Sequence, residues 1–137
     1  MFLPQIDHAG TPMVFWEIGG GDKICPLWRQ YFQNMDALML FVDATNRDFL
    51  MDARREIVNY VFTDDLPVDC PILVAANMQD LARAMSAEEV RKALNLEELV
   101  GKRRYKVLGT SGIRGEGMAE ALDWIVEHVK VARNARK

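Results

Sequence analysis

The sequence predicts an α/β fold built on a mostly parallel sheet. Three short apolar runs, at residues 37–43, 71–77 and 105–109, each have the pattern of a strand that is covered on both faces. Helical patterns lie between these runs and after the last one, and this alternation is typical of parallel sheets with crossover connections. At 137 residues the chain has the size of one domain, so we expect a single domain over residues 1–137.

The N-terminal part of the chain contains two weaker extended runs. They cover residues 2–8 and 13–18, and a turn containing Gly and Pro separates them. Three glycines end the second run, after which Asp22 is placed to cap a short helix. A longer helical pattern follows over residues 48–62. We therefore expect two strands and two helices outside the three buried runs.

Two further helices are indicated by their ends and by their apolar spacing. Residues 86–89 have the S-x-x-E form of a capping box, in which Ser86 and Glu89 satisfy each other's backbone N–H groups. In the last helix, apolar residues recur from Met118 at spacings of four, three and four, which gives one apolar face. Both helices are expected to cover the sheet.

Composition excludes several functional classes. The net charge of −3 gives no basic surface for nucleic acid or for an acidic membrane. Cys25 and Cys70 lack metal-ligand spacing and are too few for a disulfide framework, which favours a reducing compartment. Phe2 excludes an N-myristoylation site in the chain as written, and no apolar run has membrane-spanning length. His8 and His128 have no catalytic pattern around them. We expect a cytoplasmic protein without a membrane anchor of its own.

Polar and glycine-rich segments follow three of the predicted strands. They are residues 17–20, 77–80 and 111–112. In open α/β sheets, ligands bind at the carboxyl ends of the strands. These three segments together are therefore the candidate ligand-binding edge of the sheet.

Four segments in order resemble one family. Residues 16–32 are similar to the switch II segment W-D-x-G-G-Q-D-x-x-R-x-x-W-x-x-Y of the Arf and Arl small GTPases, and residues 77–81 to their guanine motif N-K-x-D-L. Residues 42–47 resemble the family's V-D-S-x-D-R, and residues 122–125 its closing helix. The resemblance covers essentially the whole chain. It implies the three-layer small-GTPase fold of the P-loop NTPase type, here lacking the first strand, the phosphate loop and the first helix.

The chain departs from the family at three positions that serve nucleotide chemistry. Glu17 replaces the Asp linked to Mg²⁺, Gly21 replaces the Gln that orients water, and Met78 replaces the Lys of the guanine motif. No G-x-x-x-x-G-K-[S/T] loop occurs in this sequence. We therefore expect no catalytic residues, no Mg²⁺ site, weak binding of GTP or GDP at most, and loss of GTP hydrolysis.

The resemblance assigns five nucleotide-binding positions. Asp80 would accept the two adjacent N–H groups of guanine and Asn77 would brace the loop, although such residues after a strand also cap ordinary turns. The backbone of Ser111 and Gly112 would reach the guanine oxygen, and the alternative is a plain strand-to-helix turn. Gly20 would offer its N–H to a γ-phosphate, and the alternative is a flexible strand terminator.

The resemblance also implies an effector surface that contains Trp16, Trp28 and Tyr31, although aromatic residues at such positions also form ordinary core. The implied partners are effectors or regulators of Arf-type GTPases, and the implied role is in vesicle trafficking, peripheral to endomembranes through those partners. The alternative is a nucleotide-independent module that presents the switch II-like surface. Because the missing strand would leave strand edges open, we also expect a homo-oligomer.

Overall fold

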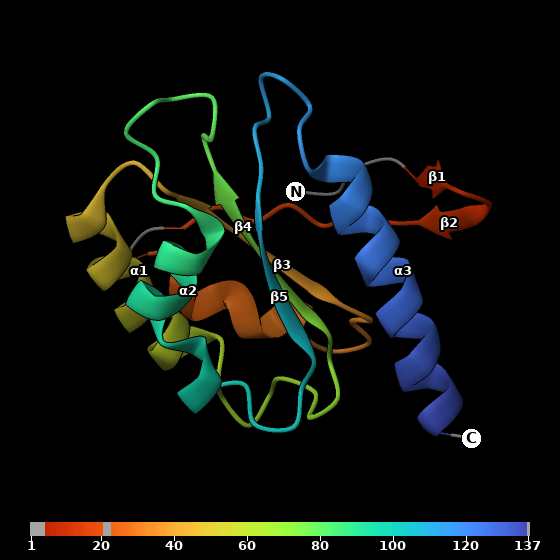
Figure 1. Cartoon of the computed structure of the whole chain (residues 1–137). Coiled ribbons are helices and arrows are strands. Elements are labelled where there is room, and N and C mark those ends of the chain that lie inside the picture. Colours follow the sequence, from red (N-terminus) through yellow and green to blue (C-terminus); the bar gives the residue numbers. More distant parts are fainter. Residues whose placement is uncertain (1–4, 21–22, 137) are drawn as a thin grey trace.

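A computed structural model describes residues 5–20 and 23–136 and contains two separate sheets (Figure 1). The smaller sheet is an antiparallel hairpin of β1 (Ile6–His8) and β2 (Thr11–Met13). The larger sheet consists of β3 (Leu38–Asp43), β4 (Ile72–Asn77) and β5 (Tyr105–Gly109). The helices are η1 (Cys25–Tyr31), α1 (Arg47–Tyr60), α2 (Ala87–Leu94), η2 (Leu96–Glu98) and α3 (Met118–Ala135), of which η1 and η2 are 3₁₀ helices.

The larger sheet is parallel and has β4 in its middle. Asp43 pairs with Asn77 at one side of β4, and Ala76 pairs with Gly109 at the other. From Ile72 to Ala76 every residue of β4 is buried, as expected for a strand with a neighbour on each side and helices on both faces. The carboxyl ends of the three strands therefore meet at one edge of the sheet.

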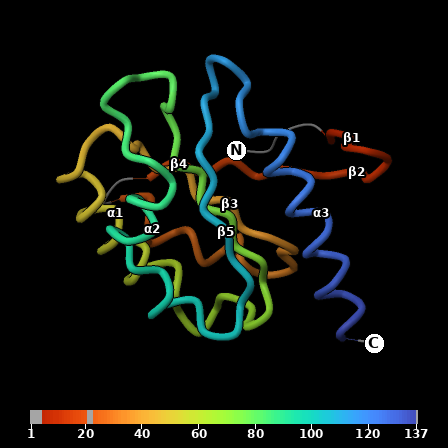
Figure 2. Tube along the Cα trace, viewed as in Figure 1, coloured from red at the N-terminus to blue at the C-terminus, as the bar shows by residue number. Residues whose placement is uncertain are grey.

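One face of this sheet is covered by α1 and α2, which Figures 1 and 2 show side by side on the face opposite α3. Leu50 of α1 and Leu94 of α2 are fully buried there. Both helices pack on the even-numbered side chains of β3 and β4. The buried residues of this face are Phe32, Val42, Ala44, Leu50, Ile57, Val61, Leu66, Cys70, Ile72, Val74, Ala76, Met85, Val90, Leu94, Leu96 and Val100.

The other face of the sheet is covered by α3 and has a smaller core. Leu73 and Ala75 of β4 pack there against Ala121 and Ile125 of α3. Phe41 points to this side in the middle of β3, yet 54% of it is exposed. The helix reaches over β4 and β5 but leaves this part of β3 uncovered.

The C-terminal end of α3 is fixed by ion pairs to two loops. Arg136 binds both carboxylate oxygens of Asp69, at 2.6 and 2.8 Å, just before β4. This pair lowers the pKa of Asp69, mainly because the guanidinium donates to the carboxylate. Arg133 binds Asp36, just before β3, at 2.8 Å. Both contacts join α3 to the amino ends of strands that lie beneath it.

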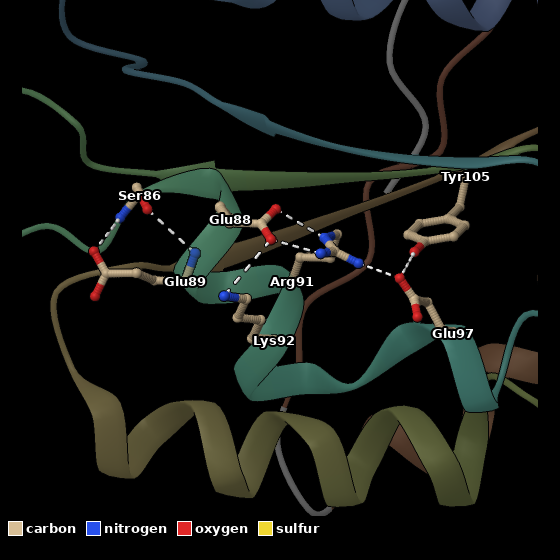
Figure 3. A network of polar contacts seen from close by, with 7 residues as sticks. All are labelled: Ser86, Glu88, Glu89, Arg91, Lys92, Glu97 and Tyr105. Carbon is tan, nitrogen blue, oxygen red and sulfur yellow. Dashed lines mark hydrogen bonds and ion pairs between the residues drawn. The ribbon is translucent and has the colours of Figure 1, made fainter.

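The cap predicted for α2 is confirmed. The Ser86 hydroxyl accepts from the backbone N–H of Glu89, and the Glu89 carboxylate accepts from the backbone N–H of Ser86, both at 3.2 Å. Figure 3 shows the same helix carrying an exposed network in which Arg91 joins Glu88 and Glu97. At the N-terminus of α1, the Asn46 side chain accepts from the N–H of Phe49.

The N-terminal strands differ from the prediction. The described strands cover residues 6–8 and 11–13, so the second extended run ends as a strand at Met13 instead of Ile18. The regular ladder after the two-residue turn pairs Ile6–His8 with Thr11–Met13, and Trp16 forms a further β-bridge beyond the end of β2. The predicted cap Asp22 lies outside the described residues. The described helix begins at Cys25, with Ile24 at its N-cap and no side-chain cap.

Both cysteines are buried, and burial raises the pKa of the Cys70 thiol to about 12. A thiol with such a pKa is neutral and unreactive near neutral pH. Over the ranges that the structure describes, no helix combines the length and apolar composition needed to cross a membrane.

Candidate functional site

The carboxyl ends of β4 and β5 are joined by hydrogen bonds. Asn77 is the last residue of β4, and its side-chain oxygen accepts from the Thr110 hydroxyl at 3.0 Å. The backbone N–H of Thr110 donates to Ala76, also at 3.0 Å. Thr110 is fully buried, so its hydroxyl needs this partner. Asn77 is thereby held in one orientation at the edge of the sheet.

Asp80 is held by Ser111 in a similar way. The Ser111 hydroxyl donates to Oδ1 of Asp80 at 2.9 Å and accepts from the backbone N–H of Arg114 at 3.2 Å. Ser111 is fully buried. Oδ1 therefore accepts one hydrogen bond from the protein, which orients the carboxylate. We call Asn77, Asp80 and Ser111 the rim, and the structure brings these three predicted residues together.

The loop that carries Asp80 has a fixed shape. Met78 adopts a left-handed conformation, with φ of 68°. Next to it, Gln79 donates its backbone N–H to Thr110 at 3.0 Å, and its side-chain amide donates to Ala76 and to Met85, at 3.2 and 2.7 Å. These bonds close the loop on itself. Met78 stays 39% exposed, so its thioether side chain is open to solvent beside the rim.

The segment after Ser111 forms a small closed turn. Ser111 and Glu116 exchange two backbone hydrogen bonds, at 3.0 and 3.1 Å, around exposed residues that begin with Gly112. Gly117 then starts α3 with φ of 80°, and a Cβ there would lie 2.5 Å from the carbonyl oxygen of Gly109. Only glycine fits this position. The backbone of Gly112 is thus presented beside the rim, in the turn predicted from the glycines.

Gly20 lies away from the rim, beside η1 and α1. A Cβ on Gly20 would be 3.9 Å from Trp28 and 3.9 Å from Glu56, so this glycine is beside η1 and α1. Trp28 donates its indole N–H to the carbonyl oxygen of Gly19 at 2.9 Å. The structure therefore groups Gly20 with the η1 region and not with the rim residues of β4 and β5.

The three aromatic residues of the predicted effector surface divide into two kinds. Trp16 and Tyr31 are 58% and 39% exposed, and their ring centroids are 6.0 Å apart. Trp28 is half-buried and packs against the core beneath α1 and α2. Trp16 and Tyr31 are thus the exposed members of the predicted effector surface. Trp28 instead packs on the core.

A shallow depression of about 540 Å³ lies at the carboxyl end of β3, where Asp43 faces the start of α1. Oδ1 of Asp43 accepts from the hydroxyl and the backbone N–H of Thr45, at 2.6 and 2.8 Å. Both hydrogen bonds lower the pKa of Asp43, and the bond from the Thr45 hydroxyl has the larger effect. Arg47 and Arg83 also line the depression. Within the described ranges, no group of three or more His, Cys, Asp or Glu residues could hold a metal ion.

Sequence reasoning missed two residues that shape this edge. Thr110 orients Asn77, and Gln79 closes the loop before Asp80. A polar residue directly after a buried strand, as Thr110 is, was the available signal. The contacts of Gln79 depend on the path of the loop, which no local pattern determines.

Comparison with known proteins identifies the family. The model of the ADP-ribosylation factor family, Arf, matches residues 3–129. This chain belongs to the Arf family. The predicted family is thereby confirmed, and two of the three rim residues, Asn77 and Asp80, lie in the segment that was assigned to the guanine motif.

A solved structure supports the same assignment. The Arf-family chain is similar to the Arl6 (BBS3) small GTPase of Trypanosoma brucei, whose structure contains the bound nucleotide analogue GppNp. The two share 26% sequence identity, the match covers 96% of this chain and 80% of that one, and the TM-score is 0.86. The predicted small-GTPase fold, with a mostly parallel sheet between helices, is therefore confirmed.

Proposed function

We propose that this chain is a guanine-nucleotide-binding regulatory protein of the Arf/Arl type that acts in intracellular vesicle trafficking. The observation that carries the proposal is the rim. The Asp80 carboxylate is fixed by the Ser111 hydroxyl on Oδ1, and both carboxylate oxygens retain lone pairs for further donors. Guanine presents adjacent N1–H and N2–H donors, which one carboxylate accepts together, whereas adenine lacks this pair. Asn77, Ser111 and the backbone of Gly112 complete the proposed base site.

GTP hydrolysis is not part of this proposal. Phosphoryl transfer depends on a phosphate-binding loop, its Lys, a bound Mg²⁺ and a residue that orients water. Glu17 and Gly21 stand where the family has its Mg²⁺-linked Asp and its water-orienting Gln. Removal of a single electrostatic donor typically costs about 10²- to 10³-fold in rate. We therefore propose weak, Mg²⁺-independent binding of GTP or GDP without turnover.

A titration of fluorescently labelled GDP and GTP onto the purified chain tests the proposal. Binding that is weakened at least tenfold in Asp80→Asn, and that is absent for labelled ADP, is the expected result, because an amide presents a donor where guanine also has one. Asp123→Asn is the matched control, since Asp123 lies on α3. Absence of GDP and GTP binding at millimolar nucleotide contradicts the proposal for this chain.

A nucleotide-independent protein-interaction module is the second candidate function. The exposed pair of Trp16 and Tyr31 favours it, because aromatic residues are enriched at interface centres. The expected partners are effectors or regulators of Arf-type GTPases. Loss of a captured cell-extract protein on Trp16→Ala, with unchanged capture by Phe49→Ala, supports this candidate. Phe49 is a suitable control because it is a similarly exposed aromatic residue on α1. Equal capture by both variants contradicts it.

Two further features belong to the proposal. In the described part of the chain, β3 pairs with β4 alone, so the opposite edge of β3 offers backbone groups to another strand. We propose a homo-oligomer formed through that edge. We also propose a cytoplasmic location, with contact to endomembranes made through partner proteins.

A further inference from the structure

The rim presents hydrogen-bond acceptors and a negative charge. Asp80 is oriented by the Ser111 hydroxyl at 2.9 Å, and Asn77 by the Thr110 hydroxyl at 3.0 Å. Both hydroxyl residues are fully buried, so these orientations are fixed by the fold. A carboxylate attracts N–H donors and repels phosphate oxygens, which are acceptors and negatively charged. The rim therefore suits the base of a nucleotide and opposes its phosphates.

Three exposed apolar side chains lie close to the rim along the chain. Met78 and Leu81 are exposed in the loop that carries Asp80, and Ile113 is 88% exposed in the turn after Ser111. The backbone N–H of Leu81 donates to the Met78 carbonyl oxygen at 3.0 Å, which fixes these two residues relative to each other. A thioether is polarizable and packs well on flat rings. These side chains offer contact to a planar base, but neither a charge nor a hydrogen-bond donor to a phosphate.

On the β5 side of the rim, the Arg114 guanidinium has an acidic neighbour. Its Nη1 lies 3.7 Å from Oε1 of Glu116, in the same closed turn. Residues 110–117 contain no other charged side chain, so this segment carries no net charge. A phosphate beside the turn meets the carboxylate as well as the guanidinium, and its attraction to one is offset by its repulsion from the other.

On the β3 side of the rim, the cations also have acidic neighbours. Asp43 pairs with Asn77 across the two strands, so the depression at Asp43 adjoins the rim. Arg83 lines this depression together with Asp43, and the two attract each other. Arg47 lines it too and donates to Glu89 at 2.9 Å. A phosphate chain that leaves the rim toward β3 or toward β5 thus passes cations whose charge is already offset.

Sites that bind nucleotide phosphates tightly use cations that form charge-assisted hydrogen bonds to the phosphate oxygens. The charges around the rim lack this arrangement. We propose that the rim recognises guanine itself, as the free base or the nucleoside, with Met78 packed on the face of the purine, and that phosphates add no affinity. This ligand class rests on the function proposed above, because it requires the base site at Asp80. A chain with such a site responds to the total concentration of guanine compounds and not to the ratio of GTP to GDP.

Titrations of guanosine, GMP, GDP and GTP onto the ¹⁵N-labelled chain test the ligand class. The NMR shift of the Gly112 backbone N–H reports binding, and EDTA keeps Mg²⁺ from changing the phosphate charge. We expect GTP to bind no more than about threefold more tightly than guanosine, with little change when NaCl is raised from about 50 to about 300 mM, because no ion pair to phosphate forms. Adenosine is expected to cause no shift.

The outcomes separate this ligand class from the base site on which it rests. If GTP binds more than about threefold more tightly than guanosine, the base site stands and the nucleoside proposal is overturned. If none of the four guanine compounds shifts the Gly112 resonance at millimolar concentration, the base site itself is overturned, and the nucleoside proposal with it.

Two variants test whether charge balance is the reason. Glu116→Gln removes the carboxylate beside Arg114, and Met78→Lys adds a cation next to the rim. In each variant GTP should bind at least about threefold more tightly than in the parent chain, while guanosine binding stays the same. Glu127→Gln is the matched control, because it removes the same charge from an exposed position further along α3. Unchanged GTP binding in both variants, or an equal gain in the control, contradicts the explanation by charge.

A third variant tests the contact with Met78. Met78→Ser shortens an exposed side chain in a loop that other residues hold, so the loop keeps its shape. We expect the affinities for guanosine and GTP to fall by the same factor, about threefold, because the lost contact is with the base that both ligands share. Unchanged guanosine binding in Met78→Ser excludes Met78 from the site.

Discussion

The two faces of the parallel sheet differ in how completely helices cover them. On the α1 and α2 face, sixteen buried residues form one continuous core in the described part of the chain, whereas the α3 face has four. β3 shows the contrast within one strand, because Val42 is 5% exposed and its neighbour Phe41 is 54% exposed. Burial of apolar area is the main source of folding free energy. The first face therefore supplies most of the stability, and the second face is less completely covered.

The largest expected effect is a difference in stability loss between variants on the two faces of the sheet. Leu50→Ala deletes a fully buried side chain of α1 and should lower the free energy of unfolding by about 2–5 kcal/mol. Met39→Ala changes a partly buried residue of β3 on the α3 face and should cost less than half as much. Urea denaturation of both variants measures the difference. Equal losses would show that the α3 face is as well packed as the other.

The next largest effect is expected at Gly117, the N-cap of α3. Gly117→Ala places a Cβ at a left-handed φ of 80° and 2.5 Å from the Gly109 carbonyl oxygen, so the backbone must shift. We expect a loss of about 1–3 kcal/mol, measured by thermal unfolding. Gly101→Ala is the control, because Gly101 also has positive φ but a Cβ there meets no atom within 4 Å. If Gly117→Ala loses no more stability than Gly101→Ala, the close approach of the Cβ to the Gly109 carbonyl oxygen does not contribute.

A pH-dependent prediction concerns Asp43, at the end of the strand that both faces share. Thr45 holds the folded-state pKa of Asp43 below its unfolded value, so this stabilisation is present above the unfolded pKa, near pH 4, and is lost as pH falls through the folded pKa. Thr45→Val should therefore lower stability by about 1 kcal/mol at pH 7, and by progressively less toward pH 2. Urea unfolding at a series of pH values measures this. If the stability difference between Thr45→Val and the parent chain stays constant down to pH 2, the effect comes from packing and not from the charge of Asp43.

The smallest effect on stability is expected at Phe41. Because this side chain is 54% exposed, Phe41→Lys should change the free energy of unfolding by only about 0.5 kcal/mol. A charged residue on an open strand edge opposes pairing with another strand, so the variant should be monomeric while the parent chain associates. Light scattering coupled to size-exclusion chromatography measures both. A monomeric parent chain would contradict the proposed oligomer.

The sequence predicted the parts of this fold that depend on local chemistry. The three parallel strands, the capping box at Ser86 and the amphipathic α3 all follow from patterns within about twenty residues. The expectation that all three strands are covered on both faces holds for β4 and is wrong for β3, where Phe41 is exposed. The rim was also predictable, because Asn77 ends β4, Ser111 comes two residues after the end of β5, and the ends of these paired strands must meet. These features need no knowledge of how distant segments approach each other.

Other features depend on distant segments and gave no local signal. The sequence around His8 gives no sign of a partner, yet its side chain lies against Asp123, 115 positions away. Trp28 was assigned to the exposed effector surface, but its indole N–H finds Gly19 and its ring packs on the core. Sequence periodicity identifies which side chains are apolar. It does not say which of two nearby aromatic residues the tertiary fold will cover.

The ion pairs at the C-terminal end of α3 also bear on how the protein is made. On a ribosome, β3, α1, β4, α2 and β5 emerge before α3, and domains begin to fold as they emerge. Asp36 and Asp69 are synthesised before Arg133 and Arg136, which bind them in the folded chain. Until they arrive, Leu73 and Ala75 of the central strand lack the helix that covers them. For that interval the nascent chain exposes an apolar sheet face to chaperones and to neighbouring chains.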